Sequence, residues 1–215
     1  MTESSKATKL RDMVRNKIPK KTENTLVVIR HGATKLNNDS DEKFRGWADI
    51  PLSDEGKAQA TATGKSLKGA GIHGIITSDL GRTKETANLV SKEIGAPVLE
   101  ATKGLRPWHL GDLTGQPVKP NLPALQAYIK NPEQVVPGGE SFNDFKKRMV
   151  DEVLKIQKKY PKDKIAIVTH HRGERLLQAW IDAGRPTDHA KLSPEPFMHK
   201  GIKPGDYTTH EVPPK

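Results

Sequence analysis

Cysteine is absent from this chain of 215 residues, and several classes of site are excluded with it. Without thiols there is no disulfide framework, no thiolate nucleophile and no zinc site with cysteine ligands. No apolar run approaches the roughly 20 residues that cross a bilayer. The positive charges near residue 1 precede no apolar segment of the kind that secretory signals contain. We therefore expect an intracellular, cytoplasmic protein without a membrane span.

Aromatic residues are scarce, at 5% of the chain, whereas basic residues are abundant and give a formal net charge of +10. Residues 1–22 contain seven basic and two acidic side chains. We expect a basic extension over 1–24, with a short helix near 10–18, and a single domain over 25–215. The extension could contact a polyanion weakly, but it lacks the interleaved aromatics of nucleic-acid sites, and a solvated arm is the simpler interpretation. The oligomeric state is left open.

Buried strand patterns alternate with amphipathic helical patterns from residue 25 onward. Strands are expected near 25–30, 72–77, 98–99, 165–169 and 207–212, and helices over about 53–68, 79–94, 122–130, 142–160 and after 171. Ser53, Ser141 and the pair Ser78-Asp79 are predicted to cap the helices that follow them. The alternation predicts a three-layer α/β/α fold with a mainly parallel central sheet. Residues 103–140, rich in glycine and proline, are expected to form a cap over a site.

Basic side chains and histidines follow the predicted strands where the strands end. Arg30 and His31 follow the first strand, His170 follows the fourth, Arg82 lies in the first turn after the second, and Arg45 lies in a nearby loop. Strand ends converge at one edge of a parallel sheet, so these groups should form an electropositive cup. Arginines match phosphate oxygens, and a neutral histidine can attack phosphorus. Zinc held by the two histidines would need a third ligand, and the surrounding arginines make it the less favoured use.

Five segments, in chain order between about 25 and 212, resemble those of the histidine phosphatase superfamily, the phosphoglycerate-mutase-like fold. They are Arg30-His31-Gly32 with Thr34 and Asn37, residues 45–53 with Gly56, residues 78–87, residues 137–141 and residues 168–170. Each is weak alone, but five in register are a strong signal.

The resemblance implies a mechanism that needs no metal and no organic cofactor. His31 would attack phosphorus and become a phosphohistidine, which water would then cleave. The phosphoryl oxygens would be held by Arg30, Arg45, Arg82 and His170, and Asn37 is assigned to substrate binding. Because His31 must be neutral to attack, its other ring nitrogen should donate to a backbone carbonyl, and that of Gly32 is the candidate.

The chain departs from the family at the proton donor for the leaving group. Many members carry a glutamate four residues before the first glycine of a turn that matches residues 111–115 here, and this position is Pro107. The other large branch places an aspartate directly after the second histidine, where this chain has His171. Glu140 is the first candidate for the acid, and a carboxylate that holds the phosphate-binding arginines is an equal interpretation of it. The further candidates are Asp112, His109, His171 and Asp49.

The function favoured by the sequence is a phosphatase that cleaves phosphomonoesters of a small metabolite or of a phosphoprotein. The intact His31 and His170 support it. Pro107 and the basic tail support an alternative, a catalytically weak member that binds a phosphorylated ligand and is docked by its tail. A phosphoglycerate-type mutase ranks third, because it requires a long-lived phosphoenzyme and the sequence shows no sign of one.

Overall fold

The computed structural model describes residues 25–37, 42–188, 192–193 and 201–211. The helix predicted near 10–18 lies outside these residues. In chain order the elements are β1 (Thr25–Arg30), η1 (Lys35–Asn37), α2 (Asp54–Leu67), β2 (Gly74–Ser78), α3 (Gly81–Ile94), β3 (Val98–Thr102), η2 (Lys103–Leu105), η3 (Gly111–Leu113), α4 (Val118–Lys130), α5 (Phe142–Lys159), β4 (Ile165–Thr169), α6 (His171–Asp182) and β5 (Tyr207–Glu211). The five predicted strands are confirmed, with small shifts at their ends.

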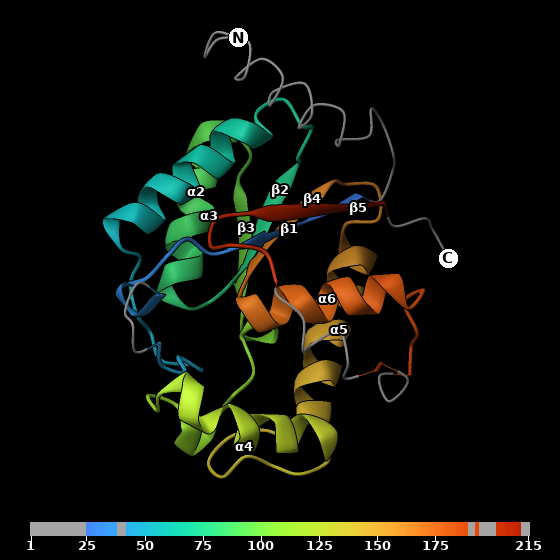
Figure 1. Cartoon of the computed structure of the whole chain (residues 1–215). Coiled ribbons are helices and arrows are strands. Elements are labelled where there is room, and N and C mark those ends of the chain that lie inside the picture. Colours follow the sequence, from blue (N-terminus) through green and yellow to red (C-terminus); the bar gives the residue numbers. More distant parts are fainter. Residues whose placement is uncertain (1–24, 38–41, 189–191, 194–200, 212–215) are drawn as a thin grey trace, which may run out of the picture.

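The five strands form one sheet in the order β3-β2-β4-β1-β5 (Figure 1). The first four are parallel to their neighbours, and β5 alone runs antiparallel, along the free side of β1. This confirms the mainly parallel sheet. It also places β4 between β1 and β2, so three strands that end in candidate site residues are adjacent.

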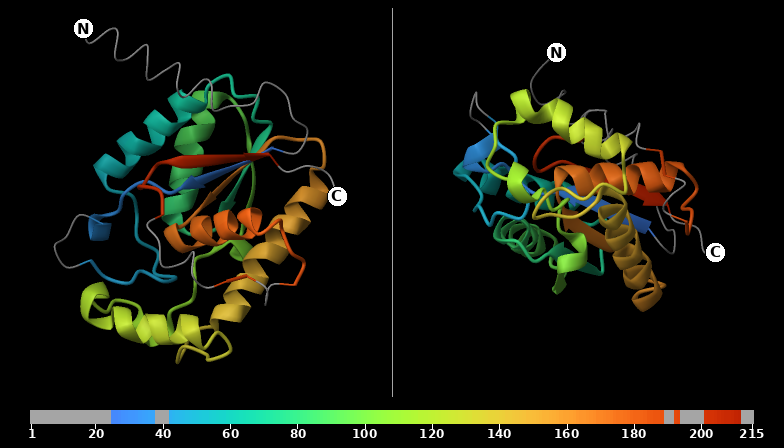
Figure 2. Two further views of the ribbon diagram at one scale, coloured as in Figure 1. Left: turned by 45° about the vertical axis from the view of Figure 1, so that its right-hand side comes forward. Right: turned by 90° about the horizontal axis from the view of Figure 1, so that it is seen from below.

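Helices cover both faces of the sheet, as Figures 1 and 2 show. Alternate residues of β1 explain the two layers, because successive side chains of a strand point to opposite faces. Leu26 and Val28 belong to a core shared with α5 and α6, whereas Val27 and Ile29 belong to a second core shared with α2 and α3. The four residues are almost completely buried. The predicted three-layer α/β/α architecture is therefore confirmed.

Two of the three predicted helix caps are confirmed and one is wrong. The hydroxyl of Ser53 accepts from the N–H of Gly56 at the start of α2, and Ser141 caps α5 in the same way. The pair Ser78-Asp79 does not cap α3, whose N-cap residue is Leu80 with no side-chain hydrogen bond. Both side chains are engaged elsewhere, in contacts with residues far away in the sequence that are described below.

The segment 103–140 contains more regular structure than the sequence suggests. α4 begins at Val118 rather than near residue 122, and both Pro120 and Pro123 lie inside it. A proline in a first helical turn removes an N–H that would have no partner there, so Pro120 does not prevent the earlier start. The segment lies against the loop that carries Arg45: the N–H of Phe44 donates to Gln116 O at 3.0 Å, and that of Val118 to Glu42 O at 2.7 Å. The segment therefore packs beside one loop of the predicted site, and its role as a cap over that site stays a prediction.

Within the described ranges, the structure contains no helix with the length and apolar character needed to cross a membrane. The described strands form one sheet with helices on both faces. The single domain expected over 25–215 stays a prediction. The division of the chain at residue 24 stays a prediction, because the preceding residues are not described.

Candidate active site

The two histidines lie side by side at the carboxyl edge of the sheet. β1 and β4 pair in parallel with Arg30 opposite Thr169, so the next residue of each strand is His31 or His170. The N–H of His31 donates to Thr169 O at 3.0 Å, and the ring centroids of the two histidines are 5.2 Å apart in an edge-on arrangement. Each is 2% exposed. The convergence predicted from the strand ends is present.

The contacts of His31 fix its tautomer. Its Nδ1 lies 2.7 Å from the carbonyl oxygen of Gly32, the partner expected from the sequence. Because a carbonyl can only accept, Nδ1 carries the hydrogen and the lone pair of the neutral ring is on Nε2. Burial, with Arg82 and Arg30 nearby, holds the pKa of His31 well below its usual range. The ring is therefore neutral at physiological pH.

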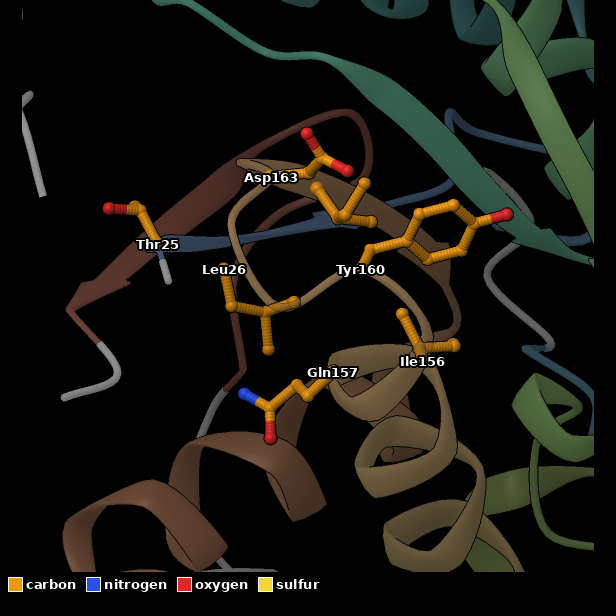
Figure 3. A pocket seen from close by; sticks show the side chains of 7 residues that line it. Thr25, Leu26, Ile156, Gln157, Tyr160 and Asp163 are labelled. Carbon is orange, nitrogen blue, oxygen red and sulfur yellow. The ribbon is translucent and has the colours of Figure 1, made fainter. Parts of the chain in front are cut away.

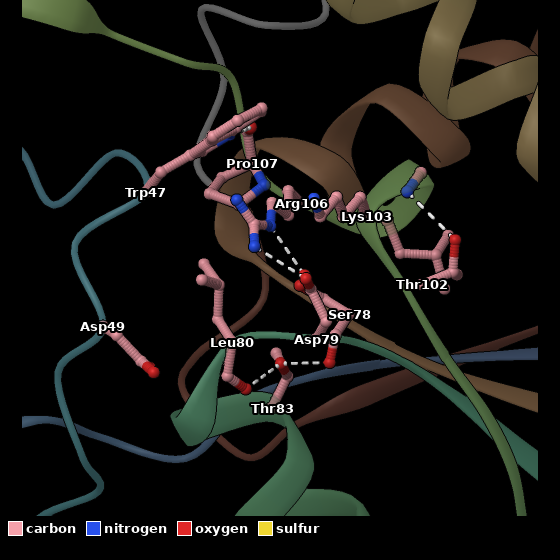
Figure 4. A network of polar contacts seen from close by, with 12 residues as sticks. Trp47, Asp49, Ser78, Asp79, Leu80, Thr83, Thr102, Lys103, Arg106 and Pro107 are labelled. Atoms are coloured by element: carbon pink, nitrogen blue, oxygen red, sulfur yellow. Dashed lines mark hydrogen bonds and ion pairs between the residues drawn. The ribbon is translucent and has the colours of Figure 1, made fainter.

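His170 is positioned by the end of β2. Its Nε2 lies 3.0 Å from the hydroxyl of Ser78, one of the residues that sequence analysis assigned to a helix cap. Burial and the charge of Arg82 lower the pKa of His170 well below its usual value. The second misassigned cap residue, Asp79, receives two hydrogen bonds of 2.6 Å from the guanidinium of Arg106 (Figure 4). The end of β2 is thus part of the site rather than a helix cap.

Arg82 comes from the first turn of α3 and is 1% exposed. Its two terminal nitrogens donate to backbone carbonyls of the loop after Arg45, at 2.7 Å to Ala48 O and 3.2 Å to Gly46 O. Burial, followed by the charge of Arg45, lowers its pKa to about 10. Arg82 therefore remains protonated at neutral pH and holds the loop against the histidines.

Arg30 and Arg45 complete the predicted cup. Arg30 donates to Ile202 O at 2.6 Å, and Arg45 donates to Leu36 O at 3.3 Å. Burial and the charge of Arg45 lower the pKa of Arg30 to about 10, and burial also lowers the pKa of Arg45. Because like charges destabilise one another when water is excluded, an anion bound among these guanidinium groups would relieve an existing repulsion.

Asn37 lies on the η1 turn at the entrance of this loop. Its Oδ1 accepts from the N–H of Thr34 at 2.9 Å and from the Thr34 hydroxyl at 2.8 Å. These contacts brace the turn that follows His31. The substrate-binding role assigned to Asn37 stays a prediction.

A hollow at the opposite edge of the sheet is separate from this cluster. It is lined by residues from the start of β1, including Thr25 and Leu26, and from the end of α5, including Ile156 and Tyr160 (Figure 3). His31 and His170 follow the other ends of β1 and β4. Over the ranges that the structure describes, no group of three or more His, Asp or Glu side chains could hold a metal ion.

Comparison with known proteins identifies the family. The model of the histidine phosphatase superfamily (branch 1) matches residues 26–195. The chain belongs to this superfamily. The uncharacterized phosphatase PhoE of Bacillus subtilis is 29% identical to it over 159 residues, which cover 74% of this chain and 78% of the relative.

Other relatives are named either as mutases or as phosphatases. Phosphoglycerate mutase-like protein 4 of Arabidopsis thaliana is 33% identical over 169 residues, or 75% of this chain and 71% of the relative. The metal-independent phosphoserine phosphatase of the same plant is 29% identical over 152 residues, or 67% of this chain and 63% of the relative. A solved structure of mycobacterial glucosyl-3-phosphoglycerate phosphatase with VO3 superposes with a TM-score of 0.70 at 25% identity, covering 87% of this chain and 92% of that one.

The position where many histidine phosphatases carry a glutamate is occupied by the backbone and ring of Pro107. Its carbonyl oxygen accepts from the indole N–H of Trp47 at 2.8 Å and from Arg148 at 3.1 Å. Trp47 lies in the loop between Arg45 and Ala48, so this contact joins the loop that carries Arg45 to the segment 103–140. The side chain of Pro107 offers no proton.

Glu140, the first candidate for the acid, forms a two-pronged ion pair with Arg148, at 2.7 and 3.1 Å. Its Oε1 also accepts from the N–H of His109 at 2.8 Å. Arg148 in turn donates to the carbonyl oxygens of Lys103, Gly104 and Arg106. This geometry favours the second interpretation of Glu140, a carboxylate that holds an arginine, but the arginine is Arg148 rather than a member of the cup. The catalytic role of Glu140 stays a prediction.

The other acid candidates have contacts of their own. The carboxylate of Asp49 accepts from the N–H of Gly81 at 2.5 Å, and the ring of His109 meets Trp47 edge-on, with centroids 4.2 Å apart. Asp112 is exposed on η3. Burial and the charge of Arg30 lower the pKa of His171 to about 3, so this ring carries no imidazolium proton at neutral pH.

Two charged side chains on the first turns of α6, Arg172 and Glu174, are not among the site residues predicted from the sequence. The Arg172 guanidinium carbon lies 5.7 Å from the centroid of the Phe44 ring, next to Arg45 in the chain, and burial lowers its pKa to about 10. Glu174 is 4% exposed, and burial raises its pKa to about 7, although it accepts from the N–H of Ile202. Helical spacing after His170 could have indicated that these side chains lie near the cup.

Proposed function

We propose that this protein is a phosphatase that transfers a phosphoryl group from a phosphomonoester to Nε2 of His31 and then to water, without a metal ion. The observation that carries the proposal is the state of His31. The ring is neutral, and the hydrogen bond from Nδ1 to Gly32 leaves its lone pair on Nε2. The phosphatase names of several relatives support the same reaction class.

The surrounding charges suit this reaction. A phosphoryl dianion placed among Arg30, Arg45 and Arg82 gains charge-assisted hydrogen bonds, and it offsets the mutual repulsion that lowers the pKa values of Arg30 and Arg82. Charge developing on the equatorial oxygens during transfer is stabilised by groups that are already in place. His170, held at Ser78, lies next to the attacking ring.

The test is hydrolysis of p-nitrophenyl phosphate in EDTA from pH 4 to 9. We expect activity in the parent protein and its loss, by about 10⁴-fold or more, in His31→Ala, as for removal of other enzyme nucleophiles. His73→Ala is the matched control, because His73 is exposed on the loop before β2 and should leave the rate unchanged.

Two outcomes would contradict the proposal. Activity abolished by EDTA would indicate metal-dependent chemistry. No activity in either protein, with phosphate still raising the melting temperature of the parent, would favour the alternative of a phosphate-binding member without catalysis.

A further inference from the structure

The position where many members of the family carry the acid offers no side-chain proton to a leaving group. Pro107 has no side-chain proton, and its carbonyl oxygen is taken up by Trp47 and Arg148. A phosphoester of an ordinary alcohol needs a proton on the departing oxygen, because an alkoxide is a poor leaving group. General acids supply about 10²–10⁴-fold in such reactions.

Three carboxyl groups in the contacts around Pro107 and Trp47 are engaged by arginines or by a backbone N–H, whereas Glu174, whose pKa burial raises to about 7, interacts with Arg30. Asp79 is paired with Arg106, which lowers the pKa of the carboxyl group. Glu140 is paired with Arg148 through both oxygens. Asp49 accepts from a backbone N–H at the start of α3. A proton on Asp79 or Glu140 would break an ion pair, so neither is built to donate one.

The cup has more positive charge than a phosphoryl group requires. Arg30, Arg45 and Arg82 suffice for a phosphoryl dianion, and Arg172 adds a fourth guanidinium beside Phe44 and Arg45. The carboxylate paired with Arg45 belongs to Glu42, whose side chain is 53% exposed and therefore offsets little of this charge. An additional negative charge on the substrate would be stabilised here.

We propose that the natural substrate carries its phosphoryl group on a carboxylate or on a second phosphate, as an acyl phosphate or a phosphoanhydride does. The absence of a proton donor at Pro107 and the fourth guanidinium at Arg172 then have one explanation, because the leaving group departs as an anion. This inference rests on the proposed function and narrows its substrate class.

The reaction balances without an acid. The lone pair of His31 Nε2 forms a bond to phosphorus, and the bond from phosphorus to the bridging oxygen breaks with its electron pair on the departing carboxylate or phosphate. Nδ1 keeps its hydrogen throughout. Water then attacks the phosphohistidine, the phosphorus–nitrogen bond breaks, and the two protons of that water remain on orthophosphate. For an acyl phosphate dianion the products are a carboxylate and dihydrogen phosphate.

The experiment compares four substrates in EDTA: acetyl phosphate, inorganic pyrophosphate, phenyl phosphate and phosphoserine, with orthophosphate release corrected for His31→Ala. We expect kcat/KM for acetyl phosphate or pyrophosphate to exceed that for phosphoserine by about 10²-fold or more. The better of the two shows whether a carboxylate or a phosphate is the leaving group. Equal values for pyrophosphate, acetyl phosphate and phosphoserine would overturn the inference.

Substitution of Pro107 provides the second readout. Pro107→Glu should raise phosphoserine hydrolysis by tenfold or more, within the range that a general acid provides, and change acetyl phosphate hydrolysis little. Pro107→Gln is the matched control, since it has the same shape without the acid. An equal effect of Glu and Gln would contradict the inference, as would a large loss for phosphoserine in His109→Ala or Asp49→Asn that acetyl phosphate does not share.

Failure of this inference can be told from failure of the proposed function. The reaction with each substrate is quenched in alkali, and the protein is then examined for phosphohistidine. If phosphohistidine forms as fast from phosphoserine as from acetyl phosphate, only the substrate class is wrong. If no substrate yields phosphohistidine while orthophosphate is released, the His31 mechanism itself is wrong.

Discussion

The two sides of the candidate site are built in different ways. The phosphoryl side consists of residues at the ends of adjacent parallel strands, where His31, His170 and Arg82 are fixed by the sheet. The leaving-group side consists of irregular backbone from residues 103–109, held by Arg148 and by Trp47. In the proposed reaction, the sheet side binds the phosphoryl group and the loop side faces the leaving group. Pro107, which replaces the glutamate expected from the family resemblance, lies on the loop side.

The largest effect is expected on the phosphoryl side, at Arg82. Arg82→Ala removes a buried guanidinium from the cup and both of its hydrogen bonds to the loop at Gly46 and Ala48. We expect kcat/KM for p-nitrophenyl phosphate to fall about 10²–10³-fold, as when a preorganised donor is removed from an active site. Lys84→Ala, at an exposed position on the same helix, should change it less than twofold. A loss below tenfold for Arg82→Ala would show that the cup does not depend on this arginine.

The next effect separates the two interpretations of Glu140 on the leaving-group side. Glu140→Gln keeps the shape but removes the charge that Arg148 requires, so the free energy of unfolding should fall by roughly 1–3 kcal/mol. Asp151→Asn is the control, because Asp151 forms an exposed ion pair with Lys147 on α5. It should lower the free energy of unfolding by at most about 0.5 kcal/mol. Urea unfolding measures both. Unchanged stability combined with a selective loss of phosphoserine hydrolysis would instead identify Glu140 as the acid.

The smallest effect concerns the pH dependence of stability at Glu174, a buried carboxyl group that interacts with Arg30. Burial raises its pKa from 4.5 to about 7 in the folded state. The folded protein therefore holds this proton more tightly than the unfolded chain does. The associated stability is fully present below about pH 4.5 and is lost as the pH rises toward 7.

Replacement by glutamine removes this dependence. Relative to Glu174→Gln, the parent should lose up to about 3 kcal/mol of unfolding free energy between pH 4.5 and 7.5. The subtraction removes the contributions of His31, His170 and His171, whose lowered pKa values act in the opposite direction. A constant difference between the two proteins over this range would show that Glu174 ionises normally.

The phosphoryl side could be predicted from the sequence because its signals are local. Each apolar run indicates a buried strand, and the residues that follow it show what lies at the strand's end. These residues are Arg30 and His31 after one run and His170 after another. Parallel pairing then brings the ends together without further information. The contact between His31 Nδ1 and the Gly32 carbonyl could also be predicted, because it spans one residue.

The leaving-group side could not be predicted, because its contacts join residues that are distant in the sequence. Arg148 donates to backbone carbonyls some forty residues earlier, and Glu140 accepts from the backbone N–H of His109; such backbone partners have no sequence signature. Ser78 and Asp79 resemble helix caps in the sequence, but Ser78 contacts His170 and Asp79 accepts from Arg106, a pair that Figure 4 shows. The local capping role is lost where a partner distant in the sequence, the ring of His170 or the guanidinium of Arg106, binds the side chain instead.

The measurement that tests the central claim most directly is the location of the transferred phosphoryl group. The protein is mixed with acetyl phosphate in EDTA, quenched in alkali within the first turnover and digested for mass spectrometry. The account predicts a phosphoryl adduct on the peptide that contains His31, absent in His31→Ala and lost as orthophosphate appears. Turnover without an adduct, or an adduct on His170 instead, would contradict it.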